Sequence, residues 1–119
     1  MRRTIIITLI LIFTVAAVYT FTGRQLLSPS QAKQKIAKGE INTVIDVRTK
    51  VEFDAGHYPG AAHIPVQEIS SKTTTGLPPR GLLVYCNTGQ RARYAAQKLS
   101  SLGFRDVYYI ACGYTCLTP

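Results

Sequence analysis

The sequence predicts an α/β domain in which helices cover a parallel sheet. Short β-branched and apolar runs alternate along the chain with segments of helical spacing, which is typical of parallel sheets. The fifteen residues 67–81 separate two of these runs, and they provide enough chain for the crossover that parallel neighbours need. Ligands bind beyond the carboxyl ends of such strands, so the functional residues are expected there.

Residues 1–22 are expected to direct export. Two arginines near the amino end precede residues 5–22, which carry no charge. This apolar run is close to the minimum length of a membrane anchor, and the arginines mark its cytoplasmic side. A cleaved signal peptide is the alternative, with residues 15–17 as its cleavage site. Both interpretations place residues 23–119 as one domain in the periplasm or another extracytoplasmic space, and the length of the run favours the uncleaved anchor.

The first elements of the domain are predicted from turn and cap residues. Arg24 to Leu27 can form a short strand. Ser28 then has the properties of an N-cap, Pro29 those of a first helical residue, and Gln31 completes a capping box. Gly39 is typical of the residue that ends a helix.

Two strands and a loop follow. Residues 42–48 (NTVIDVR) are largely β-branched and apolar, as in a strand buried on both faces. Residues 50–60 are polar and punctuated by Gly56 and Pro59, which predicts a loop. Residues 61–66 form a short strand that a proline limits.

The carboxy-terminal half contains the central strand, residues 81–86, which ends at Cys86. A helix is predicted from Gln90, because apolar residues then recur at helical spacing. These residues are Ala92, Ala95, Ala96, Leu99 and Leu102, with Gly103 as the cap. The last strand, residues 106–111, should lie beside the central one.

Charge and cysteine content limit the possible functions. The formal net charge is +8, from 14 basic and 6 acidic residues, and it is +6 without Arg2 and Arg3. This balance suits small anionic substrates or an acidic surface. The basic residues are scattered and belong to no recognisable nucleic-acid module, so no nucleic-acid partner is expected. Three cysteines are an odd number, so at least one thiol stays unpaired in an oxidising compartment.

The turn after the central strand is the candidate site. Its backbone N–H groups and the helix amino terminus that follows form an anion-binding concavity, which stabilises a thiolate at Cys86. Gly89 can adopt the positive φ that a short loop requires, and Arg91 and Arg93 add positive charge. A buried cysteine can also be a simple hydrophobic residue. The coincidence of thiol, glycine, arginine and helix start favours a reactive one.

Three segments carry a resemblance to a known family: VIDVRTKVEFDAGHYPGAAHIP, VYCNTGQRA and LSSLGFRDVYYIACGY. From Leu26 to about Tyr114 the chain resembles the single-domain rhodaneses, most closely the small bacterial ones exported to the periplasm. The resemblance implies a three-layer rhodanese-like domain that needs no cofactor. It also implies that Cys86 takes a sulfane sulfur from a donor such as thiosulfate, holds it as a persulfide, and passes it to cyanide or an acceptor thiol.

Loop length supports this assignment. Cys86 to Arg91 is Cys-x4-Arg, whereas the related phosphatases and arsenate reductases use Cys-x5-Arg. The shorter cradle should fit a terminal sulfur or thiosulfate better than a tetrahedral oxyanion with its leaving group. By position in the family motif, backbone donors around the persulfide come from Asn87, Thr88, Gly89, Gln90 and Arg91. The Arg91 side chain is expected to face the anion, with pairing to a carboxylate as the alternative.

Other polar residues are expected to be structural. Asp46 and Arg48 lie at a strand end, where buried charge is more often a structural pair, and Arg48 also has a plausible spacing to Glu52. Residues that match His57 and His63 are usually structural in the family. Their spacing, and that of the carboxy-terminal cysteines, matches no zinc-site pattern, so no metal is expected.

Cys112 is the departure from the family pattern. Related rhodaneses usually have two glycines within the segment that residues 111–113 form here. The strand geometry predicts that Cys112 lies nearer to Cys86 than Cys116 does, close enough to act as a resolving thiol. A tolerated small residue and a local bridge to Cys116 are the alternatives.

Three functions follow from these features. A sulfurtransferase that uses Cys86 is favoured. A thiol-redox or oxyanion-reducing protein would add Cys112 or Cys116, and a non-catalytic binding module would use the fold alone.

Overall fold

The computed structural model describes residues 25–119, and the expected export segment, residues 1–22, lies outside them. No helix within 25–119 is long and apolar enough to cross a membrane. Four strands form one sheet in the order β2-β1-β3-β4, and every pairing is parallel, as predicted. The strands are β1 (Thr43–Asp46), β2 (Ala62–His63), β3 (Arg80–Tyr85) and β4 (Arg105–Tyr109).

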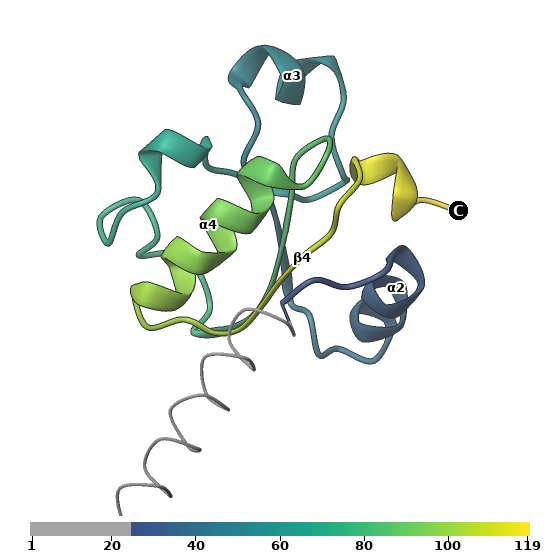
Figure 1. The fold of residues 1–119 in the computed structure, drawn as a ribbon, viewed down its shortest axis with the longest axis horizontal. Coiled ribbons are helices and arrows are strands. Elements are labelled where there is room, and N and C mark those ends of the chain that lie inside the picture. Colours follow the sequence, from purple (N-terminus) through teal and green to yellow (C-terminus); the bar gives the residue numbers. More distant parts are fainter. Residues whose placement is uncertain (1–24) are drawn as a thin grey trace, which may run out of the picture.

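Helices cover both faces of this sheet, which gives the predicted three layers (Figure 1). The α-helices are α2 (Pro29–Ala37), α3 (Lys50–Ala55) and α4 (Gln90–Ser101), and the 3-10 turns are η1 (Val66–Glu68) and η2 (Tyr114–Cys116). Because side chains alternate along a strand, Leu82 and Val84 of β3 pack toward α4, whereas Leu83 and Tyr85 pack on the side of α2. Each face of the central strand therefore has its own buried core.

The predicted start of α2 is confirmed in detail. Ser28 Oγ accepts a hydrogen bond from the Gln31 backbone N–H at 3.1 Å, and Gln31 Oε1 accepts one from the Ser28 N–H at 2.9 Å. The helix ends just before Gly39, which has a φ of +76°. The strand expected at residues 24–27 is reduced, in the described part, to an isolated bridge between Leu26 and Tyr109.

Two predictions about helices were wrong. Residues 50–55 form α3 rather than a loop, because Thr49 and Glu52 make a second capping box. At the end of α4, Leu102 was expected in the core but is 38% exposed. The helix stops at Ser101, so Leu102 is the C-cap and leaves the buried face.

Candidate active site

Cys86 lies where the sequence predicted, directly after β3 and before the amino terminus of α4. The side chain is 1% exposed. Its Sγ accepts hydrogen bonds from the backbone N–H groups of Gly89 at 3.2 Å and Ala92 at 3.4 Å. These donors and the positive end of the twelve-residue helix α4 both stabilise a negative charge on sulfur.

Gly89 forms the tight turn of the loop, and the residues that follow β4 pack against it. Gly89 has a φ of +99°, and a Cβ built there would lie 2.9 Å from the Cα of Ala111. A Cβ on Gly113 would lie 3.8 Å from the Cys86 carbonyl oxygen. Residues 111–113 therefore line the back of the loop, and the position of Gly89 excludes a larger residue.

The backbone N–H groups of the loop and of the first turn of α4 include two that contact the Cys86 thiol and two that have no acceptor within the helix. Gly89 contacts the thiol as predicted, and Ala92, one helical step beyond the expected set, is the second donor. Gln90 and Arg91 are the first residues of α4, so their N–H groups have no acceptor within the helix. The side chains of Asn87, Thr88 and Gln90 are exposed around the loop.

Arg91 forms a bidentate pair with Glu52 of α3. Nη1 lies 2.8 Å from Oε1, and Nη2 lies 3.1 Å from Oε2. Hydrogen bonds from Arg91 and from the Thr49 backbone hold the pKa of Glu52 well below its usual range. The pKa of Arg91 is raised, mainly by its hydrogen bonds to Glu52. The carboxylate pairing that the sequence left as the alternative is thus present.

Glu52 also holds the other end of the loop, because Asn87 Nδ2 donates to its Oε2 at 2.7 Å. One carboxylate on α3 therefore contacts side chains before and after Gly89. The sequence placed Glu52 near Arg48 and missed both contacts. No local spacing could indicate pairs 35 and 39 residues apart.

The Asp46–Arg48 pair is structural, as predicted. Arg48 Nη2 lies 2.7 Å from Asp46 Oδ2 and also donates to the Gly56 carbonyl oxygen at 2.6 Å. Tyr85 donates its hydroxyl proton to Asp46 Oδ2 at 2.6 Å. Burial raises the pKa of Asp46, but the bonds from Arg48 and Tyr85 outweigh it and the pKa is lowered. The suggested pairing of Arg48 with Glu52 was wrong, because Arg48 is turned inward to Asp46.

His57 and His63 each stack on the ring of Phe53, with ring centroids 3.7 and 4.4 Å from that of Phe53. His57 Nδ1 is 2.8 Å from the Phe53 carbonyl oxygen, and His63 Nε2 is 2.8 Å from the Arg48 carbonyl oxygen. Both histidines therefore have structural roles. Within residues 25–119 no group of histidine, cysteine or acidic side chains could hold a metal ion.

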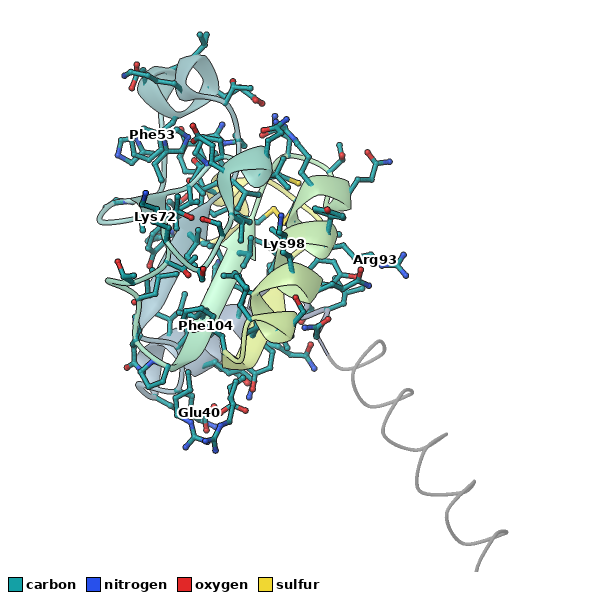
Figure 2. The ribbon with its side chains drawn as sticks, turned by 90° about the vertical axis from the view of Figure 1, so that its left-hand side faces the viewer. Glu40, Phe53, Lys72, Arg93, Lys98 and Phe104 are labelled. Carbon is teal, nitrogen blue, oxygen red and sulfur yellow. A yellow bond between two sulfur atoms is a disulfide. The ribbon has the colours of Figure 1, made fainter. Side chains whose placement is uncertain are left out.

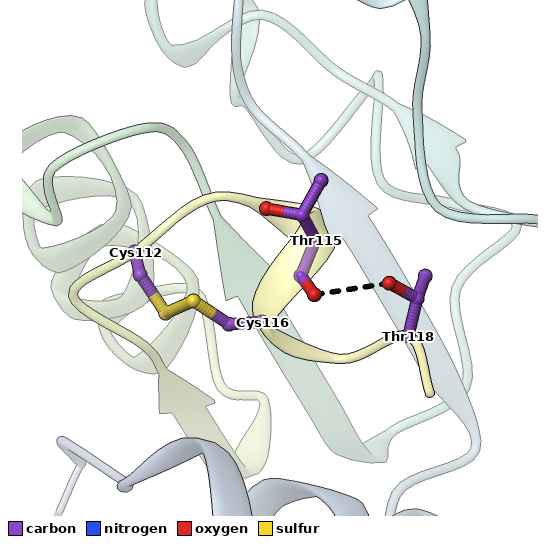
Figure 3. The surroundings of a disulfide bond; sticks show 4 residues. All are labelled: Cys112, Thr115, Cys116 and Thr118. Atoms are coloured by element: carbon purple, nitrogen blue, oxygen red, sulfur yellow. Dashed lines mark hydrogen bonds between the residues drawn. A yellow bond between two sulfur atoms is a disulfide. The ribbon is translucent and has the colours of Figure 1, made fainter.

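Cys112 is not the expected resolving thiol. It forms a disulfide with Cys116, with the two Cα atoms 6.4 Å apart, and this bridge closes the turn of η2 (Figure 3). Cys112 packs on the core of the α2 face, whereas Cys86 belongs to the core of the α4 face. The local bridge, weighed as an alternative, is the one that forms, and Cys86 is the free cysteine of the described chain.

One part of the site was not predicted. A groove of about 470 Å³ adjoins the loop at Gln90 and Arg91 and continues along α4. The spacing of Tyr94 and Lys98, one helical turn apart on an exposed face, is the signal that could have indicated it.

Comparisons with known proteins agree with this geometry. A family model described as the rhodanese-like domain matches residues 28–116. A putative sulfur carrier protein of Bacillus subtilis, YrkF, is 30% identical over 81 residues, which cover 68% of this chain and 44% of that protein. The thiosulfate sulfurtransferase PspE of Escherichia coli is 34% identical over 65 residues, which cover 53% of this chain and 62% of that protein.

The fold also matches a solved structure. The human single-domain sulfurtransferase TSTD1 superposes with a TM-score of 0.63 at 27% identity, over 76% of this chain and 92% of that one. The chain spans less than two thirds of the length of the two bacterial relatives.

Proposed function

Because the chain belongs to the rhodanese-like domain family, whose relatives support sulfur transfer in general, we propose that it carries sulfane sulfur as a persulfide on Cys86. The Cys86 thiolate attacks the outer sulfur of thiosulfate, the S–S bond of the donor breaks, and sulfite leaves with that bonding pair. An acceptor such as cyanide then attacks the outer sulfur of the persulfide. Thiocyanate forms, and Cys86 returns to the thiolate.

The observation that carries this proposal is the pair of N–H groups directed at Cys86 Sγ. A merely hydrophobic buried cysteine needs neither donor, whereas both donors stabilise the negative charge of a thiolate or persulfide. Arg91, the second residue of α4, supplies a cation next to the loop for a dianionic donor. The six-residue loop, with Ala111 packed behind Gly89, leaves little room to enlarge the cradle. These features favour a small sulfur donor over a phosphate ester.

The thiol-redox alternative is less well supported, because Cys112 is joined to Cys116 and packs on the face of the sheet opposite Cys86. A binding module that does no chemistry would not require the sulfur-directed donors.

The test is sulfur transfer from thiosulfate to cyanide, measured as thiocyanate. Wild-type protein and the Cys112→Ser/Cys116→Ser double variant are expected to turn over, while Cys86→Ser is expected to be inactive. Loss of activity in the double variant with a folded Cys86 loop would favour the redox function. No turnover in any variant, with no sulfur bound to Cys86, would favour the binding module.

We also propose that the domain is exported and anchored by residues 5–22. Support comes from the two arginines before that apolar run and from the Cys112–Cys116 disulfide, since disulfides persist mainly in oxidising compartments. Expression of the full chain in a bacterial host, followed by fractionation and alkaline extraction, tests this. Retention in the membrane with a protease-accessible domain after outer-membrane disruption is expected, and recovery in the cytosol would refute export.

A further inference from the structure

The segment that carries the disulfide packs against the active-site loop. A Cβ built on Gly89 would lie 2.9 Å from the Ala111 Cα and 3.2 Å from its Cβ. A Cβ on Gly113 would lie 3.8 Å from the Cys86 carbonyl oxygen. Cys112 stands between these two contact points. A displacement of Cys112 therefore moves the residues that pack against the loop.

Tyr114, the first residue of η2, connects the same segment to the loop by a second route. A Cβ on Gly56, the C-cap of α3, would collide with the Tyr114 hydroxyl. The centroid of the Tyr114 ring lies 5.5 Å from Arg48 Cζ, and Arg48 donates to the Gly56 carbonyl oxygen. The helix α3 in turn carries Glu52, which pairs with Arg91. The position of η2 thus reaches the loop through α3 as well as directly.

The disulfide is a covalent restraint on a short turn. η2 has three residues and no side-chain cap. Its backbone bonds join the Cys116 N–H to the Gly113 carbonyl oxygen at 3.1 Å and the Leu117 N–H to the Tyr114 carbonyl oxygen at 2.9 Å. A turn of this length depends on tertiary contacts. The buried side chain of Leu117 supplies one anchor, and the bridge to Cys112 supplies another. Opening the bridge should loosen η2 without releasing it, because Leu117 stays packed.

The bridge is easier to reach from solvent than the Cys86 thiol. Cys112 and Cys116 are both partly exposed, whereas Cys86 is 1% exposed. A dithiol reductant therefore meets the bridge first. Disulfides persist in oxidising compartments and are reduced in the cytosol. The redox state of the surroundings thus acts on a turn that packs against the active-site loop.

We propose that the Cys112–Cys116 disulfide positions the Cys86 loop for sulfur loading, and that a dithiol slows loading by reducing this bridge. One thiolate of the dithiol attacks a bridge sulfur, and its second thiolate then breaks the mixed disulfide. The dithiol leaves as a disulfide, and two electrons and two protons remain on the thiols of Cys112 and Cys116. The proposal rests on the proposed function, because loading is the step that reduction slows.

The test compares closed and open forms of the bridge. The closed form is the oxidised wild type. The open forms are Cys112→Ser/Cys116→Ser and wild type reduced with dithiothreitol and then desalted without oxygen, because residual dithiothreitol would accept the persulfide sulfur. Loading is measured as sulfite released from thiosulfate in a single turnover without an acceptor. Hydrogen exchange, followed by NMR, reports on the Gly89 and Ala92 N–H groups that contact the Cys86 sulfur.

Phe104→Leu and Phe104→Ala are the controls for a loss of stability alone. Phe104 packs on the core of the α4 face, so both substitutions destabilise the domain. Figure 2 shows Phe104 toward the end of the molecule where Glu40 lies, whereas Phe53, on the helix that contacts the loop, lies toward the opposite end. Urea unfolding identifies the Phe104 variant whose stability matches that of the open bridge.

Both open forms should release sulfite about fivefold more slowly, the size of one weakened hydrogen bond to the sulfur. Exchange at Gly89 and Ala92 should accelerate relative to that at Leu83, in the middle of β3, and the matched Phe104 variant should load at the wild-type rate. Unchanged sulfite release in both open forms, unchanged exchange at the loop, or an equal slowing in the matched Phe104 variant would overturn the proposal. If the oxidised wild type releases no sulfite, the proposed function fails, and exchange at Gly89 and Ala92 alone decides whether the bridge holds the loop.

Discussion

Replacing Glu52 by glutamine should improve donor binding at a small cost in stability. Glu52 places a negative charge next to a cradle that must admit a dianion, and it occupies the guanidinium of Arg91 through two hydrogen bonds. Glutamine is also accepted at the third position of a capping box, so the start of α3 after Thr49 should persist. The substitution therefore removes the negative charge of Glu52 and preserves the helix α3.

The size of the effect follows from the distances. A donor bound on the side of the Arg91 guanidinium away from Glu52 would lie roughly 7 Å from the Glu52 carboxylate. At this distance and the dielectric constant of water, the repulsion between the carboxylate and a dianion is about 1.2 kcal/mol. This corresponds to a KM for thiosulfate about sevenfold lower in Glu52→Gln. The bidentate pair is partly exposed, with side chains 34% and 28% accessible, so its loss should lower the free energy of unfolding by only about 1 kcal/mol.

Steady-state kinetics with thiosulfate and cyanide measure the first effect, and urea unfolding measures the second. Asp54→Asn is the matched control, because Asp54 is the other carboxylate on α3 and pairs with exposed Lys50. The lowered pKa of Glu52 gives a signature in pH. Its contribution to stability is present above the ordinary carboxyl pKa and is lost as pH falls through the folded pKa, so wild type and Glu52→Gln should converge in strong acid. An increased KM in Glu52→Gln would refute the reasoning, since it would mean that the carboxylate positions Arg91 rather than repels the donor.

Three further outcomes are expected. One glycine inserted after Gly89 should lengthen the cradle, lower thiosulfate turnover and raise arsenate binding; unchanged turnover would show that loop size does not select the donor. The Cys112→Ser/Cys116→Ser variant should unfold about 2 kcal/mol more easily, from the entropy of a short closed loop, while mass spectrometry still finds sulfur on the protein after thiosulfate treatment. Tyr85→Phe leaves the buried Asp46 carboxylate one hydrogen bond short and should cost about 1 to 3 kcal/mol in chemical denaturation, and a smaller cost would contradict the network.

Local signals predicted much of the fold because each has a local cause. The capping box of Ser28 and Gln31, the β-branched run around Ile45 and the helical spacing after Gln90 each determine structure within a few residues. The helix α3 was missed, although Thr49 gives the same signature, because six residues, three of them charged, are too few to show a helical apolar period.

The site was predictable where the backbone alone creates it. Cys86 and Gly89 follow from a strand that ends at a helix start. The partner of Arg91 was not predictable, because Glu52 approaches from an element 39 residues away. Cys112 was placed correctly after the strand beside Cys86, but its side chain packs on the opposite face of the sheet, which strand order cannot show.

The most direct test is the mass of the protein after treatment with thiosulfate, followed by peptide mapping under non-reducing conditions. The persulfide mechanism predicts a gain of one sulfur atom on the peptide that contains Cys86, and the loss of this sulfur after addition of cyanide. It also predicts that the Cys112–Cys116 peptides keep their disulfide throughout. No added sulfur, or sulfur located on Cys112 or Cys116 instead, would contradict the assignment of Cys86 as the sulfur carrier.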